Sequence, residues 1–191
     1  PTLADLQTSG FDVVPSVLEP ELVTALNTVS ERLLADAANR HLQKDKFTGS
    51  LIPVSKDPAF SDLIAHPAAL TAIRERGFEP TWMSGFVISK PAHSPSLGWH
   101  QDAWYWDDES AGYAAPASQL FAMYYLTDTR VENGCLRVLP GSHLKPTPLH
   151  NALKPAHSEE VRSTSKEKTN WTDLPEHASW EGAVDVPVKA G

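Results

Sequence analysis

Apolar positions in the first part of the chain recur at the spacing of an α-helix. Residues three or four apart share one helical face, and four apolar residues follow this spacing, namely Leu22, Leu26, Val29 and Leu33. Glu19-Pro20-Glu21 precedes them, and both proline and acidic side chains are favoured in a first helical turn. The pattern therefore predicts a helix that begins near Pro20 and buries one face.

After two further predicted helices, the pattern changes to short runs that are rich in aromatic and β-branched residues. Such runs, bounded by glycine, proline and asparagine, are typical of strands. The strongest turn signal is Asn133-Gly134. The predicted helices cover 58–64 and 67–76, and the predicted strands or extended segments cover 10–14, 82–89, 98–106, 119–127, 136–139 and 184–188. Helices followed by short strands predict an α+β or mainly β protein whose core is an antiparallel sandwich or barrel.

Composition narrows the classes of partner. The 191 residues suit a single domain over 1–191, and the net charge of -8 disfavours nucleic acids and anionic membranes as partners. The single cysteine, Cys135, rules out an intramolecular disulfide and a cysteine-based zinc site within this sequence, and we interpret it as a small buried side chain. No signal-peptide pattern and no apolar run of about 18 residues is seen, so we expect a cytoplasmic location. The polar region 145–182 is predicted to be a functional loop.

The segment Trp99-His100-Gln101-Asp102 carries the most informative chemistry. On a strand, residues two apart point to the same side, so His100 and Asp102 would project together. An imidazole and a carboxylate in this arrangement form two thirds of the facial triad of non-haem Fe(II) oxygenases, which leaves open positions for a co-substrate and O2. Chance alone gives roughly half a His-x-Asp pair in a chain with eight histidines, so the pair needs supporting context.

Two tryptophans supply such context. If the strand continues, Trp104 and Trp106 lie on the face of the two ligands and form an aromatic wall of a substrate pocket. The alternative is that both side chains belong to the core.

Two separate motifs together resemble the phytanoyl-CoA dioxygenase family. The first is Trp99-His100-Gln101-Asp102 with the aromatic cluster behind it. The second runs from Tyr124-Tyr125-Leu126-Thr127-Asp128-Thr129 into the Asn133-Gly134 turn and on to Pro140-Gly141-Ser142-His143. With Gly10-Phe11 and Lys90-Pro91, the resemblance covers most of the chain.

The resemblance implies a double-stranded β-helix, a cupin-like jelly roll, with N-terminal helices packed on it. It implies an oxygenase that uses Fe(II), 2-oxoglutarate and O2 to hydroxylate or otherwise oxidise a C–H bond of a small organic substrate, with release of succinate and CO2. His100 and Asp102 match the first two iron ligands. The resemblance further implies that Met123 lies near 2-oxoglutarate and that Trp106 lines the substrate pocket. Phe121 and Tyr125 would share the strand face of Met123, so we expect Tyr125 near 2-oxoglutarate and Phe121 with Trp104 and Trp106 in the pocket. For Met123, Phe121 and Trp106, burial in the core is the alternative.

The family also needs a second histidine and a cation that pairs with the far carboxylate of 2-oxoglutarate. We expect this third ligand and the C-terminal strands beyond Gly191. His143 is interpreted as a structural or loop residue. His150 and His177 are alternative ligands, and His150 is also a candidate pocket residue.

Three other functions stay open at this point. One is a non-catalytic cupin-like binding domain that retains a relic metal pair, and another is a jelly-roll domain whose tryptophans stack on a sugar. A hydrolytic zinc enzyme is disfavoured because no His-Glu-x-x-His run is present in the sequence. The sequence predicts neither the substrate nor the oligomeric state.

Overall fold

The computed structural model describes residues 3–43, 49–90, 92–94, 96–101, 112–113, 117, 119–153 and 177–191. The chain divides into two compact units. Unit 1 comprises Pro1–Asp12, Ser96–Ala122 and Leu136–Val186, and unit 2 comprises Val13–Pro95, Met123–Cys135 and Pro187–Gly191. Each unit is described by itself below.

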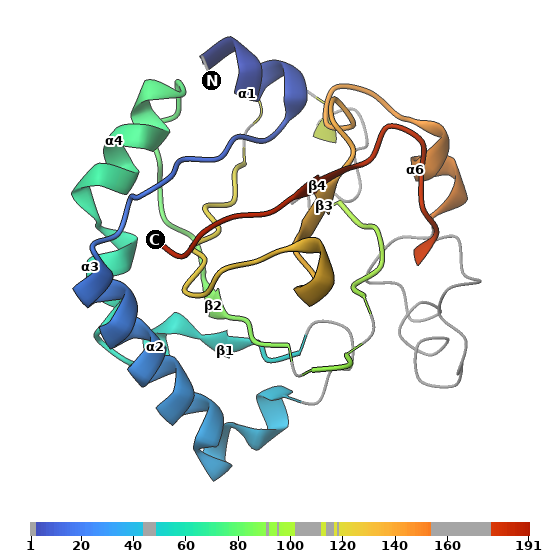
Figure 1. Cartoon of the computed structure of the whole chain (residues 1–191). Coiled ribbons are helices and arrows are strands. Elements are labelled where there is room, and N and C mark those ends of the chain that lie inside the picture. The colour runs from blue at the N-terminus through green and yellow to red at the C-terminus, as the bar shows by residue number, and fades with distance from the viewer. Residues whose placement is uncertain are drawn as a thin grey trace. The chain divides into compact units, whose positions relative to one another are not determined.

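The longest helix of unit 2 is α2 (Pro20–Ala35), which confirms the first predicted helix (Figure 1). Pro20 occupies its first turn, where the missing N–H costs no hydrogen bond. Leu26 and Leu33 are fully buried, and Leu22 and Val29 pack against the same core. The periodicity in the sequence therefore identified the buried face correctly.

The core of unit 2 joins α2 to β1 (Ile52–Pro53) and α3 (Phe60–Ile64). Its buried members are Leu18, Leu26, Leu33, Ile52, Val54 and Phe60. The helices α3 and α4 (Pro67–Glu75) confirm the predictions over 58–64 and 67–76. The 3-10 helices η1 (Ala37–Gln43) and η2 (Val54–Lys56) follow α2 and β1 in the chain.

The strand β1 pairs in antiparallel fashion with β2 (Phe86–Val87). Ser50 extends this pairing beyond the two strands. Its amide donates to the Ser89 carbonyl at 3.0 Å, and its hydroxyl donates to the Val87 carbonyl at 3.0 Å. Of the predicted strand 82–89, only Phe86 and Val87 are therefore in a regular ladder.

The C-terminal residues of unit 2 are tied to the segment 123–135. Thr129 forms an antiparallel bridge with Val188, and the Gly191 amide donates to the Tyr125 carbonyl at 3.0 Å. The Gly191 carbonyl accepts from the Leu18 amide at 3.0 Å, beside the segment that leads into α2 (Figure 1). In the same segment, the predicted turn is present as η3 (Val131–Asn133), which ends at Gly134 with a φ of 82°.

Unit 1 contains α1 (Leu3–Ser9), α6 (Pro148–Ala152) and an antiparallel pair formed by β3 (Leu136–Val138) and β4 (Val184–Val186). Arg137 and Asp185 lie opposite each other, and the Arg137 Nε is 3.0 Å from the Asp185 Oδ1. The predicted strands over 136–139 and 184–188 are thus confirmed in their first three residues.

Several predictions were wrong. The segments 10–14 and 119–127 contain no regular strand where they are described, and neither do residues 98–101 of the predicted strand 98–106. High β-propensity forms a strand only when a neighbouring segment supplies ladder hydrogen bonds. The helices α1 and α6 were not predicted.

The described residues thus form a mixed α and β structure with two 2-stranded sheets. A jelly roll is not confirmed by these short strands. The single domain over 1–191 stays a prediction. No described helix has both the length and the apolar character needed to cross a membrane.

Candidate functional site

His100 lies in the short described segment Ser96–Gln101 of unit 1. Its side chain is exposed, and its Nδ1 lies 2.8 Å from the Gly98 carbonyl oxygen. The other residues predicted around the metal, Asp102, Trp104 and Trp106, lie outside the described residues. Their predicted roles stay predictions.

The Gly98 contact determines which nitrogen of His100 carries the proton. A carbonyl oxygen only accepts hydrogen bonds, so Nδ1 must donate and carries the hydrogen in the neutral ring. The lone pair is then on Nε2. Histidines that bind metals through one nitrogen commonly donate from the other to a carbonyl or carboxylate. This tautomer is compatible with metal binding through Nε2.

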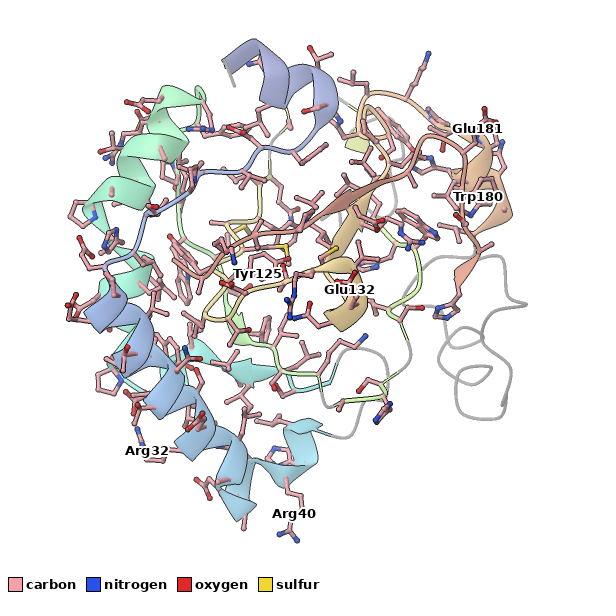
Figure 2. All side chains as sticks on the ribbon, in the orientation of Figure 1. Arg32, Arg40, Tyr125, Glu132, Trp180 and Glu181 are labelled. Atoms are coloured by element: carbon pink, nitrogen blue, oxygen red, sulfur yellow. The ribbon has the colours of Figure 1, made fainter. Side chains whose placement is uncertain are left out.

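The segment that carries His100 is held by residues 177–180. The Trp99 Nε1–H donates to the Ala178 carbonyl at 2.8 Å, and the Ser96 hydroxyl lies 3.0 Å from the His177 Nδ1. Trp180 and Glu181 follow on the turn that leads into β4 (Figure 2). His177 thus contacts the side chain of Ser96, four residues before His100. Its role as an alternative ligand stays a prediction.

His150 contacts the same segment through Gln101. It lies in the first turn of α6, where the Thr147 amide donates to its Nδ1 at 2.9 Å. Its Nε2 lies 2.7 Å from the Gln101 Oε1, and the Tyr113 ring packs edge-on at 5.6 Å between centroids. Burial lowers the pKa of His150 below its ordinary value, which favours the neutral ring.

His143 makes a structural contact within unit 1. Its Nε2 lies 2.9 Å from the Gln7 carbonyl in α1. Gly10 has a φ of 84°, and a Cβ placed there would lie 2.4 Å from the His143 Nδ1. The interpretation of His143 as a structural residue agrees with this packing. Among the described parts of the chain, no group of three or more His, Cys, Asp or Glu side chains is arranged to hold a metal ion.

Met123 and Tyr125 belong to unit 2. Tyr124 and Leu126 alternate with them and pack against the buried core, whereas Met123 is 53% exposed. Tyr125 is partly buried, and Figure 2 labels its side chain. Burial raises the pKa of the Tyr125 hydroxyl, and the nearby Cys135 thiol adds to the rise. Tyr125 therefore stays a neutral hydrogen-bond donor over a wide pH range.

Phe121 is 61% exposed, so neither it nor Met123 is part of a core in this structure. Cys135, which was predicted to be buried, is a free thiol of intermediate exposure. Its neighbours Gly134 and Leu136 are exposed, so this part of the chain does not lie in a core. An exposed aromatic and an exposed thioether are available for contact with a ligand.

Sequence reasoning missed the link between His150 and Gln101. A local signal was present, because Thr147-Pro148 has the residues favoured at the N-cap and first position of a helix. That signal predicts α6 and places His150 in its first turn. The partner of His150 is 49 residues away in the sequence, and no local pattern predicts such a contact.

Comparison with known proteins identifies the family. The family model for phytanoyl-CoA dioxygenase (PhyH) matches residues 6–191. No curated protein and no solved structure matches the chain significantly. The matched range includes the His100-x-Asp102 motif, the Asn133-Gly134 turn and His143. The chain therefore belongs to the phytanoyl-CoA dioxygenase family.

Proposed function

We propose that this protein is an Fe(II)- and 2-oxoglutarate-dependent oxygenase that oxidises a C–H bond of a small organic molecule. The observation that carries the proposal is the family match over residues 6–191. The 2.8 Å contact of the His100 Nδ1 with the Gly98 carbonyl is compatible with metal binding through Nε2. Membership of the phytanoyl-CoA dioxygenase family supports the same class of chemistry.

His100 and Asp102 would hold the metal. An imidazole with its lone pair on Nε2 and a carboxylate suit Fe(II), and such a ligand set leaves positions for a co-substrate and O2. When bound, Fe(II) and 2-oxoglutarate supply the activation of O2 that C–H oxidation requires, with succinate and CO2 as co-products. The third protein ligand is not assigned.

The remaining predicted residues would bind the organic groups. The roles that the sequence predicts for Tyr125 and Met123 near 2-oxoglutarate are part of the same proposal. Burial raises the pKa of the Tyr125 hydroxyl, which keeps it a hydrogen-bond donor. Trp104, Trp106 and Phe121 would form an apolar or planar wall for the substrate. A pocket of this kind positions the reacting C–H bond and excludes water from it.

A non-catalytic binding domain is the competing function. The two functions differ in turnover, because only an oxygenase consumes 2-oxoglutarate.

Formation of succinate from 2-oxoglutarate separates them. The assay contains Fe(II) and O2, with and without a set of small organic acids and amino-acid derivatives, and succinate is measured by mass spectrometry. We expect His100→Ala and Asp102→Ala to reduce succinate formation by at least about 100-fold, since each removes a metal ligand. His41→Gln is the matched control, because His41 is exposed on η1 of unit 2. Equal succinate formation by the wild type and Asp102→Ala under every condition would contradict the oxygenase.

A further inference from the structure

We propose that His150 is a positioning residue for the metal motif and acts through Gln101. The proposal rests on the proposed function, because it takes His100 and Asp102 as the metal ligands. Gln101 lies between these two residues in the chain, so an anchor on its side chain restrains the backbone from which both ligand side chains extend. The His150 Nε2 lies 2.7 Å from the Gln101 Oε1 and supplies this anchor.

The hydrogen bonds around His150 determine its direction of donation. A backbone N–H only donates, so the Thr147 amide, 2.9 Å away, requires an acceptor at the His150 Nδ1. The Thr147 hydroxyl, at 2.8 Å, then donates to the same nitrogen. The neutral ring carries its hydrogen on Nε2. It therefore donates to the Gln101 carbonyl oxygen, and the two groups are matched as donor and acceptor.

The ring of His150 is held on three sides. Thr147 fixes Nδ1 at the start of α6, and the Tyr113 ring packs against it with an interplanar angle of 72°. A donor that is itself held in one orientation restrains its acceptor better than a mobile side chain does. The Trp99 Nε1–H bond to the Ala178 carbonyl restrains the residue before His100 as well. The ligand-bearing segment is thus anchored on both sides of His100.

Iron affinity tests the proposal. Dissociation constants for Fe(II) are measured without oxygen on the full natural protein, for the wild type and for Gln101→Leu, His150→Phe and the double variant. Gln101→Leu removes the acceptor and leaves the contacts of His150 with Thr147 intact, whereas His150→Phe keeps an aromatic ring beside Tyr113. We expect each single variant to weaken Fe(II) binding by about 10- to 100-fold, as loss of a partner that orients a metal ligand does.

Non-additivity separates positioning from a general structural role. The dissociation constant of the double variant for Fe(II) is expected to equal that of the single variant with the lower affinity. The reason is that both substitutions remove the same interaction. Gln101→Glu keeps an oxygen acceptor and is expected to bind Fe(II) at least as tightly as the wild type. His41→Gln should change nothing. Global stability is followed by urea unfolding, and Gln101→Leu is expected to leave it unchanged because Gln101 is exposed.

Two results would overturn the proposal, and they are distinguishable from each other. The first case assumes that the wild type binds Fe(II) and that this binding depends on His100 and Asp102. Unchanged affinity in both single variants, or losses of affinity that multiply in the double variant, would then overturn the positioning role alone. A wild type that binds no Fe(II) would overturn the proposed function and the positioning role together.

Discussion

Protonation of single side chains governs what the candidate site can do. His100 donates from Nδ1 to a backbone carbonyl, and His150 accepts a backbone N–H at Nδ1, so the two rings hold opposite tautomers. In His100 the lone pair is on Nε2, which is compatible with metal binding through that atom. In His150 the hydrogen is on Nε2, which donates it to the Gln101 side-chain oxygen. These assignments follow from the fixed roles of backbone donors and acceptors.

Stability should depend on pH through His150. Burial lowers its folded pKa below the ordinary value of 6.5, so the unfolded chain binds a proton more readily than the folded one. The contribution of the neutral ring to the free energy of unfolding is therefore complete above pH 6.5. It is lost as the pH falls through the lowered pKa of the folded state. We expect urea unfolding between pH 8 and pH 5 to show a steeper loss of stability for the wild type than for His150→Gln. Parallel curves for the two proteins would contradict this linkage.

The residues of the candidate site were predictable only where the signal is local. His100 and Asp102 are two residues apart, so their pairing is visible in the sequence. The tautomer of His100 depends on the conformation of Gly98 and His100, which residue identity does not determine. The pairing of Gln101 with His150 requires a contact across 49 residues, and the sequence contains no local trace of it.

At the scale of elements, the helices α2, α3 and α4 were predicted, whereas α1, α6 and most of the strand boundaries were not. The helix α2 has its own periodicity and a first turn with Pro20 and Glu21, whereas β3 exists because β4 lies beside it. Arg137 and its cross-strand partner Asp185 are 48 residues apart in the chain. The segment 119–127 has strong β-propensity, but its described residues have no ladder partner. Ladder hydrogen bonds are non-local, and no local pattern specifies them.

Two glycines allow a test of how the β1–β2 pairing is packed. Gly49 and Gly134 both have positive φ angles, 76° and 82°. A Cβ at Gly49 would lie 2.1 Å from the Ser89 carbonyl oxygen, whereas a Cβ at Gly134 meets nothing within 4 Å. The strain of a positive φ is therefore common to both, and the clash occurs only at Gly49.

We expect Gly134→Ala to lower the free energy of unfolding by about 1–2 kcal/mol, the cost of a left-handed conformation with a Cβ. Gly49→Ala should cost about 1–3 kcal/mol more, because backbone near Ser89 must shift. Urea unfolding measures both. An equal decrease in the free energy of unfolding for the two variants would contradict the close approach of Gly49 to the Ser89 carbonyl.

For the whole molecule, family membership and fold were predictable to different extents. The family match over 6–191 confirms the resemblance that the His100-x-Asp102 motif and the Pro140-Gly141-Ser142-His143 motif indicated. The jelly roll that the family implies is not confirmed by the short strands that the structure describes. Motifs carry the chemistry of a family in a few residues, whereas a barrel or sandwich depends on many non-local strand pairs.

The central claim is that His100 and Asp102 bind iron together with 2-oxoglutarate. Its most direct test is the visible charge-transfer band that forms when Fe(II) and 2-oxoglutarate are added to the metal-free protein without oxygen. We predict a band for the wild type and for His41→Gln, and its loss in both His100→Ala and Asp102→Ala. A wild type without the band, or a band that persists unchanged in Asp102→Ala, would contradict the claim.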